Sequence, residues 1–213
     1  MSAWLLKCLL IAAGLAAWFW TQAWIARRPF PEGGLQDRVH ELTEPMNRWL
    51  LAHPRHADVL LVFTSALIDV AGVALIVSSV LGPSFAPFLG MLMLFTLRQV
   101  CQGLVALPPP PGMIWRSPGV PSLLVTYGTS SDLFFSGHTA IAVYGALELA
   151  HHFGGWGIAL GATFALLEAA TVLVLRAHYT LDVFAGAVTA LWVWAVAQTL
   201  APPVDALLAS FAR

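Results

Sequence analysis

Long apolar runs separated by short polar segments make up most of this chain and set its predicted architecture. A helix needs about 20 mainly apolar residues to cross the hydrocarbon core of a bilayer. The runs of this length predict six membrane-spanning helices, at residues 8–26, 59–81, 85–106, 136–153, 156–175 and 178–200. Pro202 and Pro203 are expected to end the last helix, because proline lacks the backbone N–H that a helix uses.

A further helix is predicted between the first two spans, over residues 35–52. Its apolar side chains recur every three to four residues, and they are Leu35, Val39, Leu42, Met46, Trp49 and Leu50. This spacing is typical of an amphipathic helix that lies in the membrane interface instead of crossing it. A second connector, between the third and fourth spans, contains the proline run 108–111. Polyproline is stiff and extended, so we expect this segment to form a rigid wall over a site.

The first apolar run has two interpretations. It ends in tryptophans beside Arg27 and Arg28, which is typical of the aromatic belt at the end of a spanning helix. A cleaved signal peptide is the alternative, but the run is long and no small-residue cleavage site precedes Arg27. We therefore expect a membrane anchor that is retained.

Composition supports the membrane assignment. The 213 residues are 59% hydrophobic and only 10% charged, whereas soluble domains carry about 25% charged residues. The expected fold class is all-α: a polytopic bundle of six transmembrane helices with an interfacial helix after the first span. We expect one membrane-embedded catalytic domain over residues 1–213. The net charge of −1 gives no indication of nucleic-acid binding.

Two polar stretches interrupt the apolar pattern where spans begin, at residues 130–139 and 176–186. His178 and Asp182 are four residues apart, so on a helix they share one face and can form a hydrogen bond. His138 lies in the other stretch, between Gly137 and Thr139. Ionisable groups near lipid are costly, which makes both stretches candidate functional sites.

The alternation of six spans should bring these stretches together. The first, third and fifth spans would end on the same face on which the fourth and sixth begin. The polar residues expected on that face are Arg98, Arg116, Asp132, His138, Arg176, His178 and Asp182. Other acidic residues within spans, namely Asp69, Glu148 and Glu168, are left as either functional or structural groups.

The chemistry that these residues allow is phosphoryl transfer between lipids. His178 would attack phosphorus and form a phosphohistidine-type intermediate, Asp182 would orient His178, and His138 would act as acid and then base. The expected substrate-binding residues are Arg98, Arg116, Asp132, Ser136, Gly137, Arg176 and Tyr179. We expect no metal and no cofactor, because no acidic cluster suited to magnesium is present. His53 and His56 are read as interfacial polar residues in preference to metal ligands.

These motifs resemble a known family. Pro29–Glu32, Arg98 followed by Leu107–Pro110, Asp132–Thr139 and His178–Val183 resemble the four motifs of the sphingomyelin synthase-related branch of the type 2 phosphatidic acid phosphatase superfamily. The resemblance implies a six-helix bundle, a His-His-Asp triad, and head-group transfer from a phospholipid donor to a lipid alcohol. The lysine and Arg-Pro motif of the phosphatases is not evident, which favours the synthase-like branch.

Other functions and the orientation stay open at this point. A lipid phosphatase or phospholipase C would use the same residues with water as acceptor, while a transporter or a non-catalytic lipid-binding protein would not need the triad. Arginines of the first loop, with Arg116 and Arg176, favour a cytoplasmic site by the positive-inside rule. The resemblance implies an extracytoplasmic site, which is our expectation. The partners expected are the lipid bilayer and its phospholipids.

Overall fold

The computed structural model describes residues 3–27, 35–127 and 133–211, and all regular structure in them is helical. The helices are α1 (Ala3–Ile25), α2 (Arg38–Ala52), α3 (Pro54–Leu81), α4 (Ala86–Leu104), α5 (Gly137–Val174) and α6 (Thr180–Ser210). The predicted all-α class is confirmed for these residues. Helix α2 occupies most of the range predicted for the interfacial helix.

Four helices of the described part of the chain are long and apolar enough to cross a membrane: α1, α3, α5 and α6. This confirms a membrane protein, while the prediction of six crossings is not confirmed by length and composition alone. Two features account for the difference. Helix α4 is apolar at first but carries Arg98, Gln99 and Gln102 near its end. The predicted fourth and fifth spans form one element, α5.

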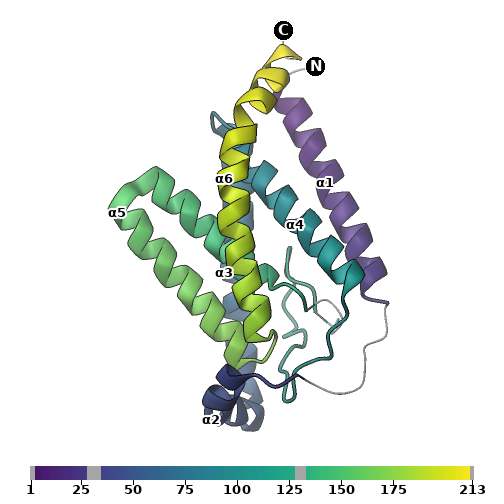
Figure 1. The fold of residues 1–213 in the computed structure, drawn as a ribbon, viewed down its shortest axis with the longest axis vertical. Coiled ribbons are helices and arrows are strands. Elements are labelled where there is room, and N and C mark those ends of the chain that lie inside the picture. Colours follow the sequence, from purple (N-terminus) through teal and green to yellow (C-terminus); the bar gives the residue numbers. More distant parts are fainter. Residues whose placement is uncertain (1–2, 28–34, 128–132, 212–213) are drawn as a thin grey trace.

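Helix α5 is bent sharply at Gly154 (Figure 1). Gly154 has a backbone φ of 58°, in the left-handed region that favours glycine, and helical geometry resumes after it. The two arms of α5 therefore run in different directions, and the break predicted between residues 153 and 156 is located at the correct position in the sequence. A Cβ at Gly157 would lie 1.9 Å from the Leu149 carbonyl oxygen, so glycine also permits the close approach of the arms.

The end of α6 corrects one prediction. The helix continues through Pro202 and Pro203 to Ser210. Each proline removes only one backbone hydrogen bond, so the helix can resume beyond them. The last turns are also held in place, because the Asp205 carboxylate accepts a 2.8 Å hydrogen bond from the Phe85 N–H at the start of α4.

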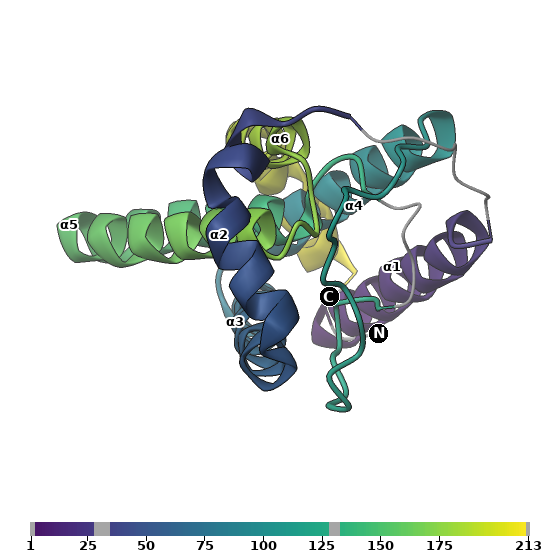
Figure 2. The ribbon, with the colours of Figure 1, turned by 90° about the horizontal axis from the view of Figure 1, so that it is seen from below.

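The helices pack so that the polar ends gather at one end of the bundle. Helix α1 lies beside α4, and α6 runs along the length of the bundle between α4 and α5 (Figure 1). Viewed from below, α2 crosses the ends of α3 and α5 outside the bundle (Figure 2). The loop from α5 to α6 and the start of α6 lie at the same end as α2. This arrangement places α2 directly against residues 176–186, the segment that contains the predicted catalytic residues His178 and Asp182.

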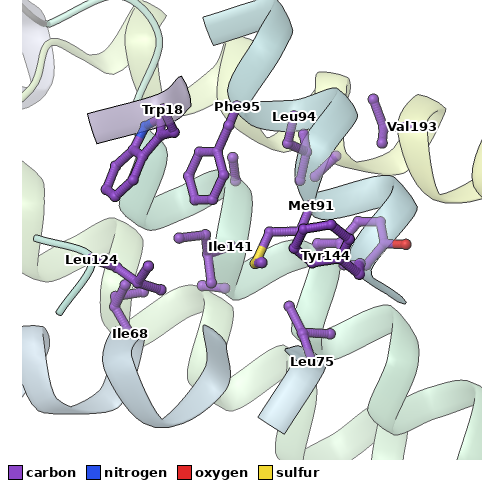
Figure 3. Packing of buried hydrophobic residues seen from close by; sticks show 14 of the residues in the cluster. Trp18, Ile68, Leu75, Met91, Leu94, Phe95, Leu124, Ile141, Tyr144 and Val193 are labelled. Atoms are coloured by element: carbon purple, nitrogen blue, oxygen red, sulfur yellow. The ribbon is translucent and has the colours of Figure 1, made fainter. Parts of the chain in front are cut away.

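The apolar core lies between α4, α5 and α6 and extends to α1 and α3 (Figure 3). Tyr144 is fully buried, and its hydroxyl donates a 3.0 Å hydrogen bond to the Ala86 carbonyl. Gly90 permits this contact, because a Cβ there would lie 2.0 Å from the Tyr144 hydroxyl. At the other end of the same core, Trp18 of α1 stacks on Phe95 of α4. The core therefore reaches from the α4–α6 contact to the wall of the site described next.

Candidate active site

The first candidate residue, His138, is fixed by the start of α5. The Ser136 hydroxyl oxygen accepts hydrogen bonds from the Thr139 N–H at 3.3 Å and the Thr139 hydroxyl at 3.0 Å. Serine with this geometry is a good N-cap, which explains why the helix begins here. His138 follows in the first helical turn with only 7% of its surface exposed.

The second and third candidate residues flank the start of α6. The Asp182 carboxylate accepts a 2.9 Å hydrogen bond from the Tyr179 N–H, so it caps the helix as well as facing His178. His178 Nδ1 lies 3.7 Å from Asp182 Oδ2. This is an ion-pair distance, longer than a hydrogen bond. Asp182 is completely buried and His178 is 5% exposed, so solvent does not screen the pair.

A main-chain hydrogen bond joins the two polar stretches. The Ser136 N–H donates to the Asp182 carbonyl oxygen at 3.0 Å. The helices approach closely here, because a Cβ at Gly186 would lie 2.6 Å from the Ser136 carbonyl oxygen. Segments more than 40 residues apart in the sequence are thereby held in fixed register.

His138 and His178 line the same small cavity, of about 40 Å³, together with Arg98, Gly137 and Trp115. Four buried polar atoms in the two stretches have no hydrogen-bond partner among the described residues: His138 Nε2, Arg176 Nε, His178 Nδ1 and Asp182 Oδ1. Buried polar atoms are normally paired. His178 Nδ1 faces Asp182, so His138 Nε2 is the unpaired atom at the cavity that a polar ligand could satisfy. The two imidazoles predicted to face one another from different helices do share this cavity.

Arg98 supplies a positive charge to the cavity. Only 8% of it is exposed, its Nε donates a 2.9 Å hydrogen bond to the Phe135 carbonyl, and its Nη1 lies 3.5 Å from Gln22 Oε1. A Cβ at Gly137 would lie 3.1 Å from Arg98 Nε, so glycine leaves room for the guanidinium beside His138. A fixed buried guanidinium is suited to phosphate oxygens.

Helix α2 fastens the loop between α5 and α6 (residues 175–179, here the α5–α6 loop) and the first residue of α6. Asp37 Oδ2 accepts a 2.6 Å hydrogen bond from the Thr180 N–H, and Oδ1 accepts one of 2.7 Å from the Thr180 hydroxyl. Asp37 Oδ1 also caps α2 through the Val39 and His40 N–H groups. Burial acts to raise the pKa of Asp37, but the hydrogen bonds from Thr180 outweigh it and hold this pKa below its ordinary value of 3.8.

His40 of α2 directly contacts His178, one of the predicted catalytic residues. Its Nε2 lies 2.9 Å from the His178 carbonyl oxygen, and because a carbonyl only accepts, His40 Nε2–H is the donor. The ring stacks on Tyr179 with centroids 5.6 Å apart. Burial lowers the pKa of His40 below its ordinary value of 6.5. A neutral imidazole therefore holds the backbone of His178.

Arg176 and Tyr179, both predicted to bind substrate, contact protein groups in the structure. Arg176 has a backbone φ of 53°, and its guanidinium donates to the carbonyl oxygens of Pro111 and His40. The Tyr179 hydroxyl accepts a 3.1 Å hydrogen bond from the Leu35 N–H. Neither residue lines the cavity that contains the two histidines.

The remaining predicted binding residues lie elsewhere. Arg116 forms a 2.6 Å ion pair with Asp58 and donates to the Pro54 carbonyl, and it is not part of the cavity wall. Asp132 lies outside the described residues, as do Pro29–Glu32 of the first motif. Ser136 is fully buried and serves as the α5 N-cap.

The three acidic residues whose roles the sequence left undecided, Asp69, Glu148 and Glu168, accept hydrogen bonds from other protein groups. Asp69 accepts hydrogen bonds from the Leu123 and Leu124 N–H groups, both at 2.8 Å, and so holds the connector before α5 against α3. Glu148 accepts a 2.8 Å hydrogen bond from the Trp194 indole, and Glu168 accepts one from the Thr64 hydroxyl. None of the three lines the cavity with the histidines.

His53 and His56 form an aromatic cluster with Trp49, with ring centroids 4.6 and 4.8 Å from the tryptophan. Within residues 3–27, 35–127 and 133–211, no group of three or more histidine, cysteine or acidic side chains could hold a metal ion.

Sequence reasoning missed Asp37, His40 and Trp18. Asp37 carries a recognisable signal as the N-cap before an amphipathic helix, but its contact with Thr180 joins segments that no periodicity relates. Trp18 was read only as part of an aromatic belt, and the structure buries it in the cavity wall.

One comparison with known proteins found a match. A family model described as AtPDCT1/2, which denotes phosphatidylcholine:diacylglycerol cholinephosphotransferase-like proteins, matches residues 36–199. The matched range includes α2, the cavity residues His138 and His178, and Asp182. No curated protein and no solved structure matched the chain.

This match overturns the family assignment made from the sequence motifs. The short motifs resemble the sphingomyelin synthase-related branch, but the model that matches most of the chain is AtPDCT1/2. A histidine-containing helix start and an HxxxD pair are short patterns that related lipid enzymes share. They therefore do not separate one family from its neighbours.

Proposed function

Because this chain belongs to the AtPDCT1/2 family, we propose that it transfers phosphocholine from phosphatidylcholine to the hydroxyl of a diacylglycerol. The observation that carries the proposal is the cavity shared by His138 and His178, with Arg98 in its wall and an unpaired Nε2 on His138. It is suited to one phosphoryl group held between two imidazoles and neutralised by a guanidinium.

In the first half of the reaction, His178 Nε2 attacks phosphorus. The Nδ1–H of His178 is directed at Asp182, which leaves the Nε2 lone pair free. The bond from phosphorus to the glycerol oxygen breaks, and His138 Nε2 gives its proton to the departing alkoxide. The products are a diacylglycerol and a phosphocholine group on His178.

In the second half, the hydroxyl of another diacylglycerol loses its proton to His138 and attacks phosphorus. The bond between phosphorus and His178 breaks, which forms a new phosphatidylcholine and restores the free enzyme. The reaction consumes no water and needs no redox partner, because one ester bond is exchanged for another of the same kind.

An aromatic pair beside His138 supports the choice of choline. The Trp115 ring lies 5.2 Å from the His138 ring and 5.0 Å from the Tyr127 ring. A quaternary ammonium over such rings gains about 0.5–2 kcal/mol from cation–π attraction. Replacing Trp115 with leucine should therefore reduce the preference for phosphatidylcholine over phosphatidylethanolamine.

The membrane arrangement proposed with this function has six crossings. Helix α4 and both arms of α5 cross in addition to α1, α3 and α6, which the bend at Gly154 supports. We further propose that the active site opens on the extracytoplasmic face. Met113 lines the cavity, so a single cysteine at this position, with Cys8 and Cys101 replaced by serine, should react with an impermeant maleimide on intact cells.

The test of the reaction uses purified protein in vesicles that contain head-group-labelled phosphatidylcholine and a diacylglycerol with different acyl chains. Labelled phosphatidylcholine with the acceptor's acyl chains should appear in wild type. His178→Ala should abolish transfer, and His138→Ala should slow it roughly 10²- to 10⁴-fold. His53→Ala, an exposed histidine that stacks on Trp49, is the matched control and should leave the rate unchanged.

Two readouts separate the proposal from its rivals. An acid-labile label on wild type that is absent from His178→Ala indicates the phosphohistidine. Free phosphocholine as the sole product would instead identify a hydrolase, and full activity of His178→Ala would refute the mechanism.

A further inference from the structure

Two stacked rings form part of the wall of the cavity that contains the two histidines. Trp18 of α1 and Phe95 of α4 have centroids 4.9 Å apart and an interplanar angle of 25°. Both rings line the cavity that contains His138 and His178. They sit at one end of the apolar core, adjacent to Ile141 and Leu124 (Figure 3).

The other side of this wall is a groove between α1 and α4 with a volume of about 360 Å³. Trp18 and Phe95 line the groove as well as the cavity. A larger groove of about 510 Å³ lies between α3 and α5, yet it shares no lining residue with the cavity. Size alone would favour the larger groove, whereas connection to the reacting groups favours the groove between α1 and α4.

Polarity changes along the α1–α4 groove. Gly14, Ala17 and Leu92 line its apolar part. Thr21 and Gln99 line the part nearer the ends of the two helices, and Gln99 donates a 3.2 Å hydrogen bond to Gln22, which also contacts Arg98. A phospholipid has the same order of groups: a charged phosphate, then ester oxygens, then an apolar chain.

Trp18 has an unused hydrogen-bond donor at this boundary. The side chain is 6% exposed, and its Nε1–H meets no acceptor among the described residues. Leaving a buried donor unpaired is costly, so such a group is normally satisfied by protein, water or ligand. An ester carbonyl, which lies between phosphate and acyl chain, is an acceptor of the right kind at this depth.

We propose that the α1–α4 groove holds an acyl chain of the substrate glycerolipid and that Trp18 Nε1–H donates to its ester carbonyl. This inference rests on the proposed function for the identity of the lipid. Trp18 is thereby a substrate-positioning residue that sets the phosphate of the lipid at the histidines, and the groove is the lateral route from the bilayer to the site.

The first experiment fills the groove. Ala17→Trp places a large ring in the α1–α4 groove, and Ala74→Trp does the same in the α3–α5 groove; both alanines are exposed on apolar helices. Ala17→Trp should raise KM about tenfold for dioleoyl phosphatidylcholine and leave dihexanoyl phosphatidylcholine nearly unaffected. Ala74→Trp should match wild type with both lipids, and equal effects of the two substitutions would overturn the proposal.

The second experiment removes only the N–H group of Trp18. Trp18→Phe keeps a ring stacked on Phe95 but loses the N–H. The KM for phosphatidylcholine with ester-linked acyl chains, the donor lipid, should therefore rise roughly 3- to 10-fold. An ether-linked donor has no ester carbonyl, and Trp18→Phe should use it as well as wild type does. A loss in Trp18→Phe that depends on the ester linkage of neither the donor nor the acceptor lipid would show a packing role and refute the hydrogen bond. Repeating this with an ether-linked acceptor identifies which of the two lipids occupies the groove.

A binding readout keeps this inference separate from the reaction. Phosphatidylcholine with a diazirine on its acyl chain should cross-link to peptides that contain residues 14–24 and 92–100, in wild type and in His178→Ala alike. Cross-linking there without head-group transfer would refute the proposed function and retain the groove. Transfer with cross-linking confined to α3 and α5 would refute the groove and retain the function.

Discussion

Replacing Asp37 with alanine should release the start of α6 from α2. The carboxylate caps α2 and accepts two hydrogen bonds from Thr180. Loss of an N-cap costs about 1 kcal/mol. Each bond from Thr180 contributes about 1 kcal/mol, below the usual range for a charged acceptor because Asp37 is only half-buried. The two bonds from Thr180 are the ones that break when the start of α6 opens, so the free energy of this local opening should fall by about 2 kcal/mol. Loss of the cap destabilises α2 separately.

Hydrogen exchange at the Thr180 amide measures this opening directly. A change of about 2 kcal/mol corresponds to roughly 30-fold faster exchange, because about 1.4 kcal/mol is a factor of ten. Head-group transfer should slow mainly through kcat, since the α5–α6 loop carries His178. Glu44→Ala is the control on the same helix: among the described residues Glu44 pairs with an exposed Arg48, and such pairs contribute less than about 1 kcal/mol. Exchange at Thr180 that stays within about threefold of wild type in Asp37→Ala would refute the assignment of α2 as the fastening element.

Three further substitutions test other parts of the site. Gly186→Ala should destabilise the protein by about 1–3 kcal/mol and slow transfer, because the added Cβ would press on the Ser136 backbone. Gly103→Ala is the control, because its Cβ meets open space, and it should change neither property. Thermal unfolding in detergent measures the difference in stability. Acidification below pH 6.5 should destabilise wild type through His40, because the pKa of His40 is lowered in the folded state and the unfolded state binds the proton more readily. In unfolding measurements from pH 7 to 5, the free energy of unfolding should fall less steeply with pH in His40→Gln than in wild type. Asp69→Asn should expose the segment 117–127 to proteolysis, because the variant loses about 1–3 kcal/mol of charge-assisted hydrogen bonds to backbone N–H groups. Unchanged cleavage would contradict the role of Asp69 in holding this segment against α3.

The positions of the long helices were predictable, because a helix that crosses a bilayer needs a long apolar run. Apolar length located the four candidate spans, and the glycine pair after Phe153 located the bend of α5. Boundaries were less accurate where polar residues belong to a helix. Helix α3 begins at Pro54 and not at residue 59, because its first turns contain Arg55, His56 and Asp58, which hydropathy excludes.

The placement of His138, His178 and Asp182 near one another followed from the alternation of spans and from helical spacing, and their catalytic roles stay predictions. Arg116 shows the limit of that reasoning. It lies on the expected face, but Asp58 pairs with it, and a topological argument cannot specify such a partner. The contacts of Asp37 and His40 depend on how α2 is placed against the bundle, which depends on tertiary packing that no local pattern encodes.

The hydrogen bond between the Ser136 N–H and the Asp182 carbonyl has a consequence for how this protein can vary. Main-chain groups are the same in every residue except proline, so substituting a side chain at either position does not remove the link. Side chains around the reacting groups can therefore diversify toward new lipids while the spacing between the two motifs stays constant. Only changes that push α5 and α6 apart, or that introduce proline at position 136, would break that constancy.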